Sequence, residues 1–154
     1  GLDMINVDEA TTAGVLVANV PGANALTVAE HVIWTAMALL RRQPQVTRDL
    51  YTAGWAAARA HADHGRELSG RTLGILGLGN IGKTLARIAH HGFGMPVVAH
   101  TRSGSSSEEV EAVSFRDLLE RADILALCAP LTEETRGMVD AAALGRMKPG
   151  AILI

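Results

Sequence analysis

The sequence predicts an α/β protein with a Rossmann-type, doubly wound parallel sheet. Apolar runs typical of strands alternate with segments of helical periodicity from residue 71 onward. The glycine-rich stretch at 74–82 joins one such run to a helix. The run within 123–128 is apolar enough for a strand that is covered on both faces. Right-handed crossovers between successive strands then predict the strand order 3-2-1-4-5.

The first 22 residues are predicted to form a unit separate from a domain at 23–154. Residues 7–13 favour a short helix and 15–20 a strand, which Pro21 and Gly22 end in a turn. Within 23–154, Thr27 and Glu30 have the spacing of a capping box at the start of a long helix. One face of this helix is apolar up to residues 41–42 and comprises Val28, Val32, Ile33, Ala36, Met37 and Leu40.

The end of this helix and its second face are less clearly defined. Pro44 is expected to end the helix, and the stretch 54–70, which has no clear period, is expected to link it to the sheet. Trp34 and Ala38 lie off the main apolar stripe. Two alternatives remain for them: a subunit interface through the 27–42 helix, or packing beneath the following segment.

The glycine turn carries the strongest functional signal. A strand at 71–76, a helix at 81–91 and a strand at 96–100 form a βαβ unit of the expected ~30-residue length. In the turn between them, Gly77 permits the sharp bend, Gly79 lets a phosphate approach the backbone, and Gly82 lets the helix lie close to the strand. The free amides of the helix N-terminus then face the anion. We therefore predict dinucleotide binding, against the alternative of a purely structural turn.

The remaining elements complete the sheet. A strand at 111–113, a helix from Ser114 to residue 121, and a strand at 123–128 are expected in that order. Two short helices capped by Thr132 and Asp140, a turn at 148–150 and a strand at 151–154 follow. This order places Cys128, Ala129 and Pro130 opposite the glycine turn, at the edge where ligands of such sheets bind.

The end of the second strand favours NADP over NAD. A carboxylate about 20 residues beyond the glycines binds the adenosine ribose in the common NAD-binding pattern. Here no Asp or Glu occurs from 83 to 107, and the strand ends in His100, Thr101, Arg102 and Ser103. Arg102 can pair bidentately with a 2′-phosphate, and the two hydroxyls can donate to it. The alternative is an arginine on a solvated loop.

Five ordered stretches resemble the D-isomer-specific 2-hydroxyacid dehydrogenase family along the whole chain: GLDMIN (1–6), NALTVAEH (24–31), GRTLGILGLGNIG (70–82), PLTEET (130–135) and MKPGA (147–151). The resemblance implies a homodimeric enzyme in which 1–22 ends the first stretch of a flavodoxin-like substrate domain and 23–154 binds the dinucleotide. By motif match, Asn80 and Ile81 would contact the pyrophosphate, and Ala129, Pro130 and Thr135 the adenosine. Asn24 falls where the formate dehydrogenase branch has an asparagine near substrate; its alternative is a turn residue.

The resemblance also implies the chemistry. Hydride passes between NAD(P)H and C2 of a small 2-oxo or 2-hydroxy acid, of the glyoxylate/hydroxypyruvate, D-lactate or phosphoglycerate type. The family's substrate-binding arginine and its proton-transferring histidine–glutamate pair match no position here. We therefore expect a fragment of a longer protein, with its sheet truncated at the C-terminal edge and without activity of its own. The alternative is a non-catalytic dinucleotide-sensing module of the corepressor type.

Composition argues against other classes of protein. The net charge is −2, and two Trp, two Phe and one Tyr offer little for base stacking, so nucleic acid is not an expected partner. No apolar run approaches the ~20 residues of a membrane span, and the single cysteine cannot form an internal disulfide, which favours a cytoplasmic location. The six histidines lack the pattern of a metal site. Cys128 is expected to be a small buried strand-end residue rather than a nucleophile.

Overall fold

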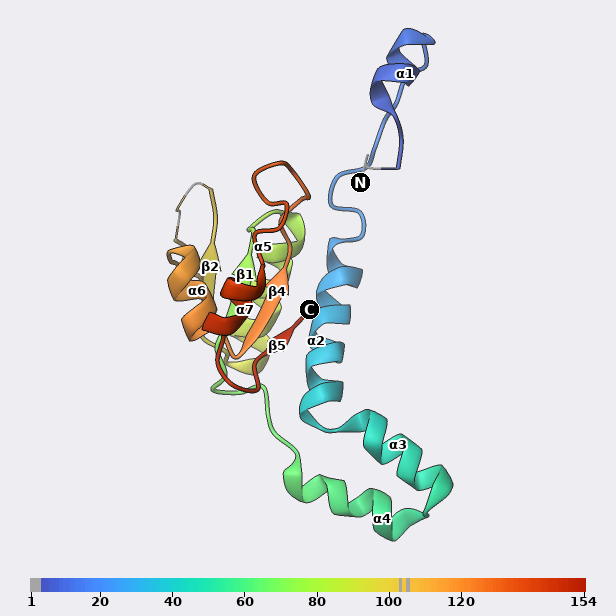
Figure 1. Ribbon diagram of the computed structural model, residues 1–154, viewed down its shortest axis with the longest axis vertical. Coiled ribbons are helices and arrows are strands. Elements are labelled where there is room, and N and C mark those ends of the chain that lie inside the picture. Colours follow the sequence, from blue (N-terminus) through green and yellow to red (C-terminus); the bar gives the residue numbers. More distant parts are fainter. Residues whose placement is uncertain (1–3, 103, 105) are drawn as a thin grey trace.

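The computed structural model describes residues 4–102, 104 and 106–154. Its centre is a five-stranded parallel sheet in the order β3-β2-β1-β4-β5 (Figure 1), which confirms the predicted topology. All five strands are short: β1 (Leu73–Leu76), β2 (Val97–His100), β3 (Glu111–Ala112), β4 (Ile124–Leu127) and β5 (Ile152–Leu153). The last residues of the three central strands, Leu76, His100 and Leu127, are level with one another. Their carboxyl ends therefore share one edge of the sheet.

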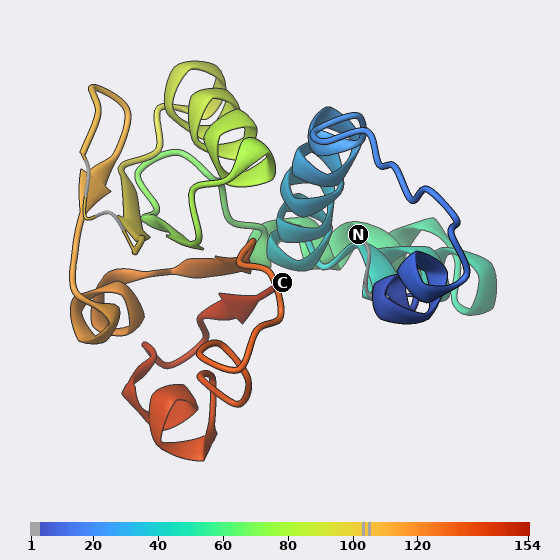
Figure 2. The same cartoon turned by 90° about the horizontal axis from the view of Figure 1, so that it is seen from above.

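Helices cover both faces of this sheet (Figure 2). On one face lie α2 (Ala25–Leu40), α5 (Asn80–Arg87) and a π-helical turn, η2 (Ile88–Gly92), and the core there includes Ile33, Ile75 and Leu85. On the other face lie α6 (Phe115–Arg121) and α7 (Ala141–Arg146), above Val98 and Leu125. Successive strand residues thus contribute to opposite cores, which explains why β1 and β4 are apolar throughout.

Two of the predicted helix caps are confirmed. The Ser114 hydroxyl accepts the Asp117 amide at 3.1 Å at the start of α6, and the Asp140 carboxylate accepts the Ala143 amide at 2.8 Å at the start of α7. Both caps could be predicted because a cap depends on residues three positions apart, not on distant parts of the chain.

α2 ends near the expected residues 41–42, but the expected capping box and the expected role of Pro44 were wrong. The helix begins at Ala25, with Asn24 as its N-cap, so Thr27 lies inside the first turn and forms no capping box. At the other end, Arg42 adopts a left-handed conformation (φ 54°), and Pro44 lies in the first turn of a new helix, α3 (Gln43–Thr52). A proline is tolerated there because the first amides of a helix need no intrahelical acceptor. The supposed link at 54–70 contains α4 (Trp55–Ala60) and a 3₁₀ turn, η1 (His61–His64).

Two other expected elements are absent from the described part of the chain. The helix α1 (Val7–Thr12) forms as predicted, but 15–20 is not a strand, because no other strand pairs with it and Leu16 is 92% exposed. Thr132 begins a turn at 133–137, not a helix. The Thr132 amide donates to the Thr135 hydroxyl at 2.8 Å, and that hydroxyl donates to the Pro130 carbonyl at 2.7 Å. These side-chain bonds act together with one helix-like backbone bond, from the Arg136 amide to the Thr132 carbonyl at 2.9 Å, to hold the turn.

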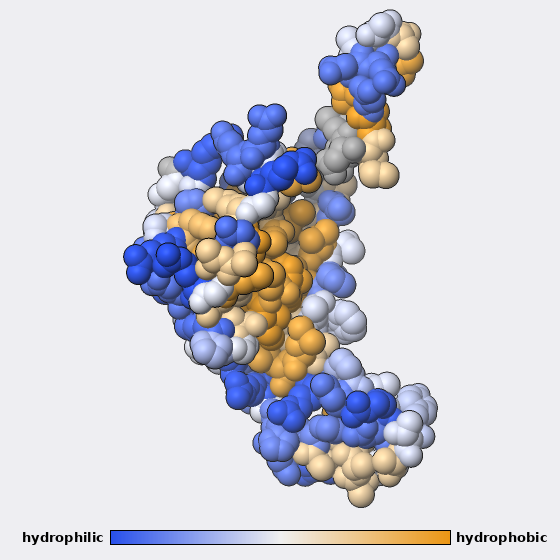
Figure 3. Space-filling view, in the orientation of Figure 1, coloured by the Kyte–Doolittle hydropathy of each residue, from blue (hydrophilic) through white to orange (hydrophobic). Residues whose placement is uncertain are grey.

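Two parts of the chain project from the sheet domain (Figure 1). α1 extends at one end of α2, and the hairpin of α3 and α4 extends at the other. Between them, a hydrophobic band runs along α2 and the neighbouring strands (Figure 3), and Leu127 of β4 and Leu153 of β5 are partly exposed. Within the described ranges, no helix has both the length and the apolar character needed to cross a bilayer.

Candidate functional site

A cavity of about 480 Å³ opens at the carboxyl ends of the strands, where the strand order reverses on either side of β1. Eight of the predicted site residues border it: Gly77, Gly79, His100, Thr101, Arg102, Ala129, Pro130 and Thr135. The fold thus brings three separate stretches of sequence to one place. Leu76, Leu78, Thr132, Glu134 and Met138 also border the cavity and were not predicted to do so. Glu134 lies inside the PLTEET stretch, so its position next to Thr135 was the available signal.

The three glycines of the turn have different surroundings. Gly77 has φ 96°, and a Cβ built on it would lie 2.8 Å from the Ala129 backbone. A Cβ on Gly82 would overlap the carbonyl oxygen of Gly77. Gly79, in contrast, has nothing within 4 Å of such a Cβ. Gly77 and Gly82 are therefore required by packing, whereas Gly79 leaves open space next to the backbone, as close approach of a phosphate requires.

The N-terminus of α5 lies directly behind this space. Gly79 is the N-cap and offers no side chain, so the amides of Asn80, Ile81 and Gly82 precede the first intrahelical bond, from the Lys83 amide to the Gly79 carbonyl at 3.0 Å. Such amides, together with the helix dipole, favour an anion.

The Asn80 side chain connects the glycine turn to the segment before α2. A Cβ on Gly22 would lie 2.9 Å from Nδ2 of Asn80, so the side chain packs on the bare Gly22 backbone. Two residues further on, Asn24 is the N-cap of α2, but its side chain makes no capping hydrogen bond. Asn24 is also the last residue of the turn at 21–24, as the alternative interpretation expected.

The end of β2 is held by its own hydrogen bonds. The His100 ring donates through Nδ1 to the Val113 carbonyl at 3.1 Å and lies 5.8 Å from the Phe115 ring. The Thr101 hydroxyl accepts the Gly104 amide at 3.0 Å. Arg102 is exposed at the cavity and has no ion-pair partner among the residues that the structure describes. Ser103 lies outside the described residues.

Cys128 does not border the cavity. It packs against the core on the α2 side, and burial raises the pKa of its thiol to about 11. The thiol is therefore protonated near neutral pH, which makes it a poor nucleophile. Within the described part of the chain, no three His, Cys, Asp or Glu side chains are grouped so as to hold a metal ion.

Comparisons with known proteins agree with this geometry. Residues 33–154 match the family described as D-isomer specific 2-hydroxyacid dehydrogenase, NAD binding domain. The whole chain is 39% identical to D-3-phosphoglycerate dehydrogenase of Mycobacterium tuberculosis, of which it covers 29%. It is 36% identical to hydroxypyruvate reductase of Thermotoga maritima, of which it covers 49%.

A solved structure gives the same result. The TT0316 protein from Thermus thermophilus matches 99% of this chain with a TM-score of 0.89 and 33% identity, and the match covers 49% of that protein. The chain therefore spans half or less of the length of these relatives.

Proposed function

Because the chain belongs to the D-isomer-specific 2-hydroxyacid dehydrogenase family by its match to the NAD-binding domain, we propose that it is the cofactor-binding part of an oxidoreductase. The reaction transfers hydride between NAD(P)H and a small 2-oxo or 2-hydroxy acid. The observation that supports this most strongly is the single cavity bordered by the glycine turn, the β2 end and the 129–135 segment.

The residues present fit a bound dinucleotide. The open space at Gly79 and the amides at 80–82 suit the pyrophosphate, and the cavity beside 100–102 and 129–135 suits the adenosine. When bound, the nicotinamide supplies or accepts the hydride. The contribution of this chain is to bind and orient the cofactor.

Asn24 is proposed to contact substrate, because its side chain makes no capping hydrogen bond at the start of α2. Asn24→Ala should raise the KM of the intact enzyme and leave cofactor affinity unchanged.

The preferred cofactor is proposed to be NADP. Arg102 borders the cavity without a partner in the described chain, and no carboxylate stands at the end of β2 to repel a 2′-phosphate. A bidentate charge-assisted pair is worth about 1.5–3 kcal/mol, so NADPH should bind ~10–100-fold more tightly than NADH.

Titration of both reduced cofactors by fluorescence tests this proposal. Arg102→Asp should reverse the preference, because the new carboxylate repels the 2′-phosphate and can accept the ribose hydroxyls. Arg59→Asp, on the distant helix α4, makes the same change in net charge and should leave the ratio of the two dissociation constants unchanged. Equal or tighter binding of NADH that Arg102→Asp does not alter would refute the proposal.

This chain is proposed to bind cofactor without turnover, because the family's arginine and histidine–glutamate pair match no position in it. Oxidation of NADPH by the 154-residue protein with glyoxylate, hydroxypyruvate or pyruvate would contradict this.

Residues 1–22 are proposed to belong to the substrate domain, since α1 has no buried residue. Deletion of residues 1–19, which spares Gly22 and its contact with Asn80, should leave the thermal unfolding midpoint of the rest of the chain unchanged. We further propose a homodimer formed through the 27–42 helix region.

A further inference from the structure

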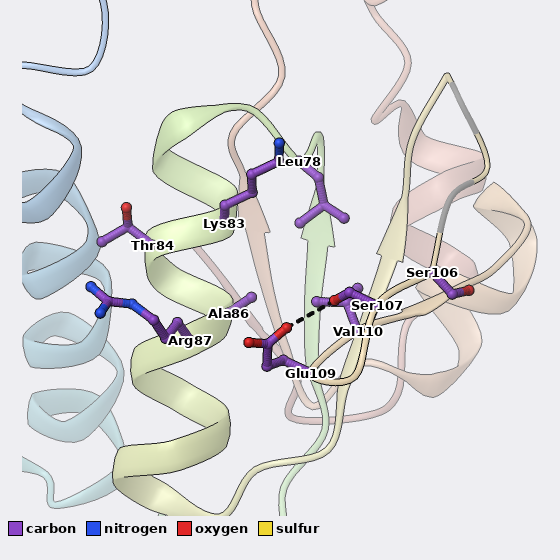
Figure 4. A pocket seen from close by; sticks show the side chains of 9 residues that line it. All are labelled: Leu78, Lys83, Thr84, Ala86, Arg87, Ser106, Ser107, Glu109 and Val110. Atoms are coloured by element: carbon purple, nitrogen blue, oxygen red, sulfur yellow. Dashed lines mark hydrogen bonds between the residues drawn. The ribbon is translucent and has the colours of Figure 1, made fainter.

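A second cavity, of about 570 Å³, also borders Leu78 (Figure 4). Its walls are α5 and the 106–110 segment that leads into β3, and it includes Lys83, Arg87 and Glu109. Leu78 borders both cavities, so they adjoin at the glycine turn. Otherwise the two linings differ: residues 100–102 border the first cavity, and Ser106 and Ser107 the second.

Lys83 borders the second cavity close to the glycine turn, where the two cavities adjoin. Its amide donates to the Gly79 carbonyl, so Lys83 lies one helical turn above the glycine at which the pyrophosphate is proposed to bind. Side chains on a helix lean toward its N-terminus, and that direction carries the ammonium back toward the turn. Figure 4 shows the Lys83 side chain at the Leu78 end of the cavity. Within the described chain, Lys83 has no ion-pair partner.

The neighbouring charges leave Lys83 available for an external anion. Glu109, the carboxylate in the cavity, accepts the Ser107 hydroxyl at 3.0 Å and lies 3.6 Å from His91, away from Lys83. Arg87, one turn further along α5, also borders the cavity, but its guanidinium points toward α2 (Figure 4). Lys83 is therefore the cation at the end of the cavity that meets the cofactor site.

We infer that Lys83 is a second cation for the adenosine 2′-phosphate, which it approaches from the α5 side while Arg102 approaches from the β2 side. This inference rests on the proposed preference for NADP. A phosphate that carries nearly two charges is held better by two separate cations than by one, and lysine serves as a point charge beside the planar arginine.

The test compares Lys83→Gln with Arg87→Gln, because each variant loses one positive charge from the exposed side of the same helix. Dissociation constants for NADPH and NADH are measured for each variant. Lys83→Gln should weaken NADPH binding about tenfold and NADH binding less than twofold, since a lost charged hydrogen bond costs roughly that factor. Lys83→Arg should retain most of the affinity, and Arg87→Gln should alter neither cofactor.

Several outcomes would overturn the inference. Equal effects of Lys83→Gln and Arg87→Gln would mean that the affinity depends only on the net positive charge of α5, not on a contact of Lys83. Equal weakening of NADPH and NADH by Lys83→Gln would place the ammonium at the pyrophosphate. If Arg102→Asp abolishes a preference for NADPH that Lys83→Gln leaves intact, the role of Lys83 fails and the proposed cofactor stands. If the unmodified protein prefers NADH, both fail.

Discussion

At the scale of single residues, two glycines of the turn have different roles: Gly82 is needed for packing, and Gly79 for binding. Gly82→Ala should destabilise the protein by about 1–3 kcal/mol, because its Cβ would overlap the Gly77 carbonyl oxygen and force α5 away from β1. Gly79→Ala should leave stability nearly unchanged, since its Cβ meets nothing within 4 Å. It should instead weaken dinucleotide binding, because the methyl group occupies the open space beside the helix amides.

Urea unfolding and cofactor titration of both variants separate the two effects. The expected result is a lower unfolding midpoint for Gly82→Ala and a raised dissociation constant at an unchanged midpoint for Gly79→Ala. Loss of stability in Gly79→Ala, or unaltered cofactor affinity in it, would contradict the assignment of this space to a phosphate.

Some residues of the site could be predicted and others could not. Gly77, Gly79 and Arg102 stand in local patterns whose chemistry is readable without the fold. Met138 borders the same cavity, but nothing in its sequence neighbourhood indicates it, because its position depends on the turn that Thr132 and Thr135 build. Residues within a local motif could therefore be predicted, whereas residues that only the fold brings to the cavity could not.

At the scale of elements, one polar contact links α3 to the 3₁₀ turn that follows α4. No residue of α3 is buried, and Nε2 of His61 lies 2.7 Å from the Asp49 carboxylate. The Arg48 side chain, and then His61, lower the pKa of Asp49 from 3.8 to about 2. A carboxyl group whose pKa is lower in the folded state stabilises that state above its unfolded pKa, and the effect is lost as the pH falls through the folded value.

This gives a pH-dependent prediction for the hairpin. The unmodified protein should resist thermal unfolding better than Asp49→Asn at about pH 6, and the difference should fade between about pH 4 and about pH 2. Fluorescence of Trp55, at the start of α4, reports the transition in a background in which Trp34 is replaced by Phe. Asp63→Asn is the matched control, because Asp63 makes only a 3.8 Å contact with Arg59 on the exposed side. A difference that persists at about pH 2 would rule out this contact as its source.

Some helices, strands and caps could be predicted from the sequence, and others could not. Ser114 and Asp140 were identified as caps because capping is local. Residues 15–20 form an apolar run rich in valine, which is typical of a strand, yet a strand exists only where a neighbour supplies hydrogen bonds, and none does in the described chain. Pro44 can follow a helix or begin one, and the left-handed Arg42 that distinguishes the two has no sequence signature.

At the scale of the whole molecule, the sheet order was predictable because crossovers between parallel strands are almost always right-handed and connect neighbouring strands. Every strand in the observed order lies next to one already placed. The projection of the α3–α4 hairpin from the sheet domain was not predictable, because it depends on the direction of α2 relative to the sheet. α2 turns Ala29, Val32 and Ala36 toward the sheet domain and leaves Trp34 62% exposed on its outer side. An exposed tryptophan on a long helix is typical of an interface between subunits.

The proposed dimer can therefore be tested at Trp34. Trp34→Asp should convert a dimer to a monomer in light scattering, because it places a charge in a desolvated apolar contact, and should preserve the fold, because the side chain is exposed in the single chain. Leu144→Asp introduces the same charge at a 48% exposed position of α7, on the opposite face of the sheet, and should leave the dimer intact. A monomeric unmodified protein would contradict the proposal. Dimers that survive Trp34→Asp and are lost when a charge replaces Leu153 would assign the interface to the edge of β5 instead.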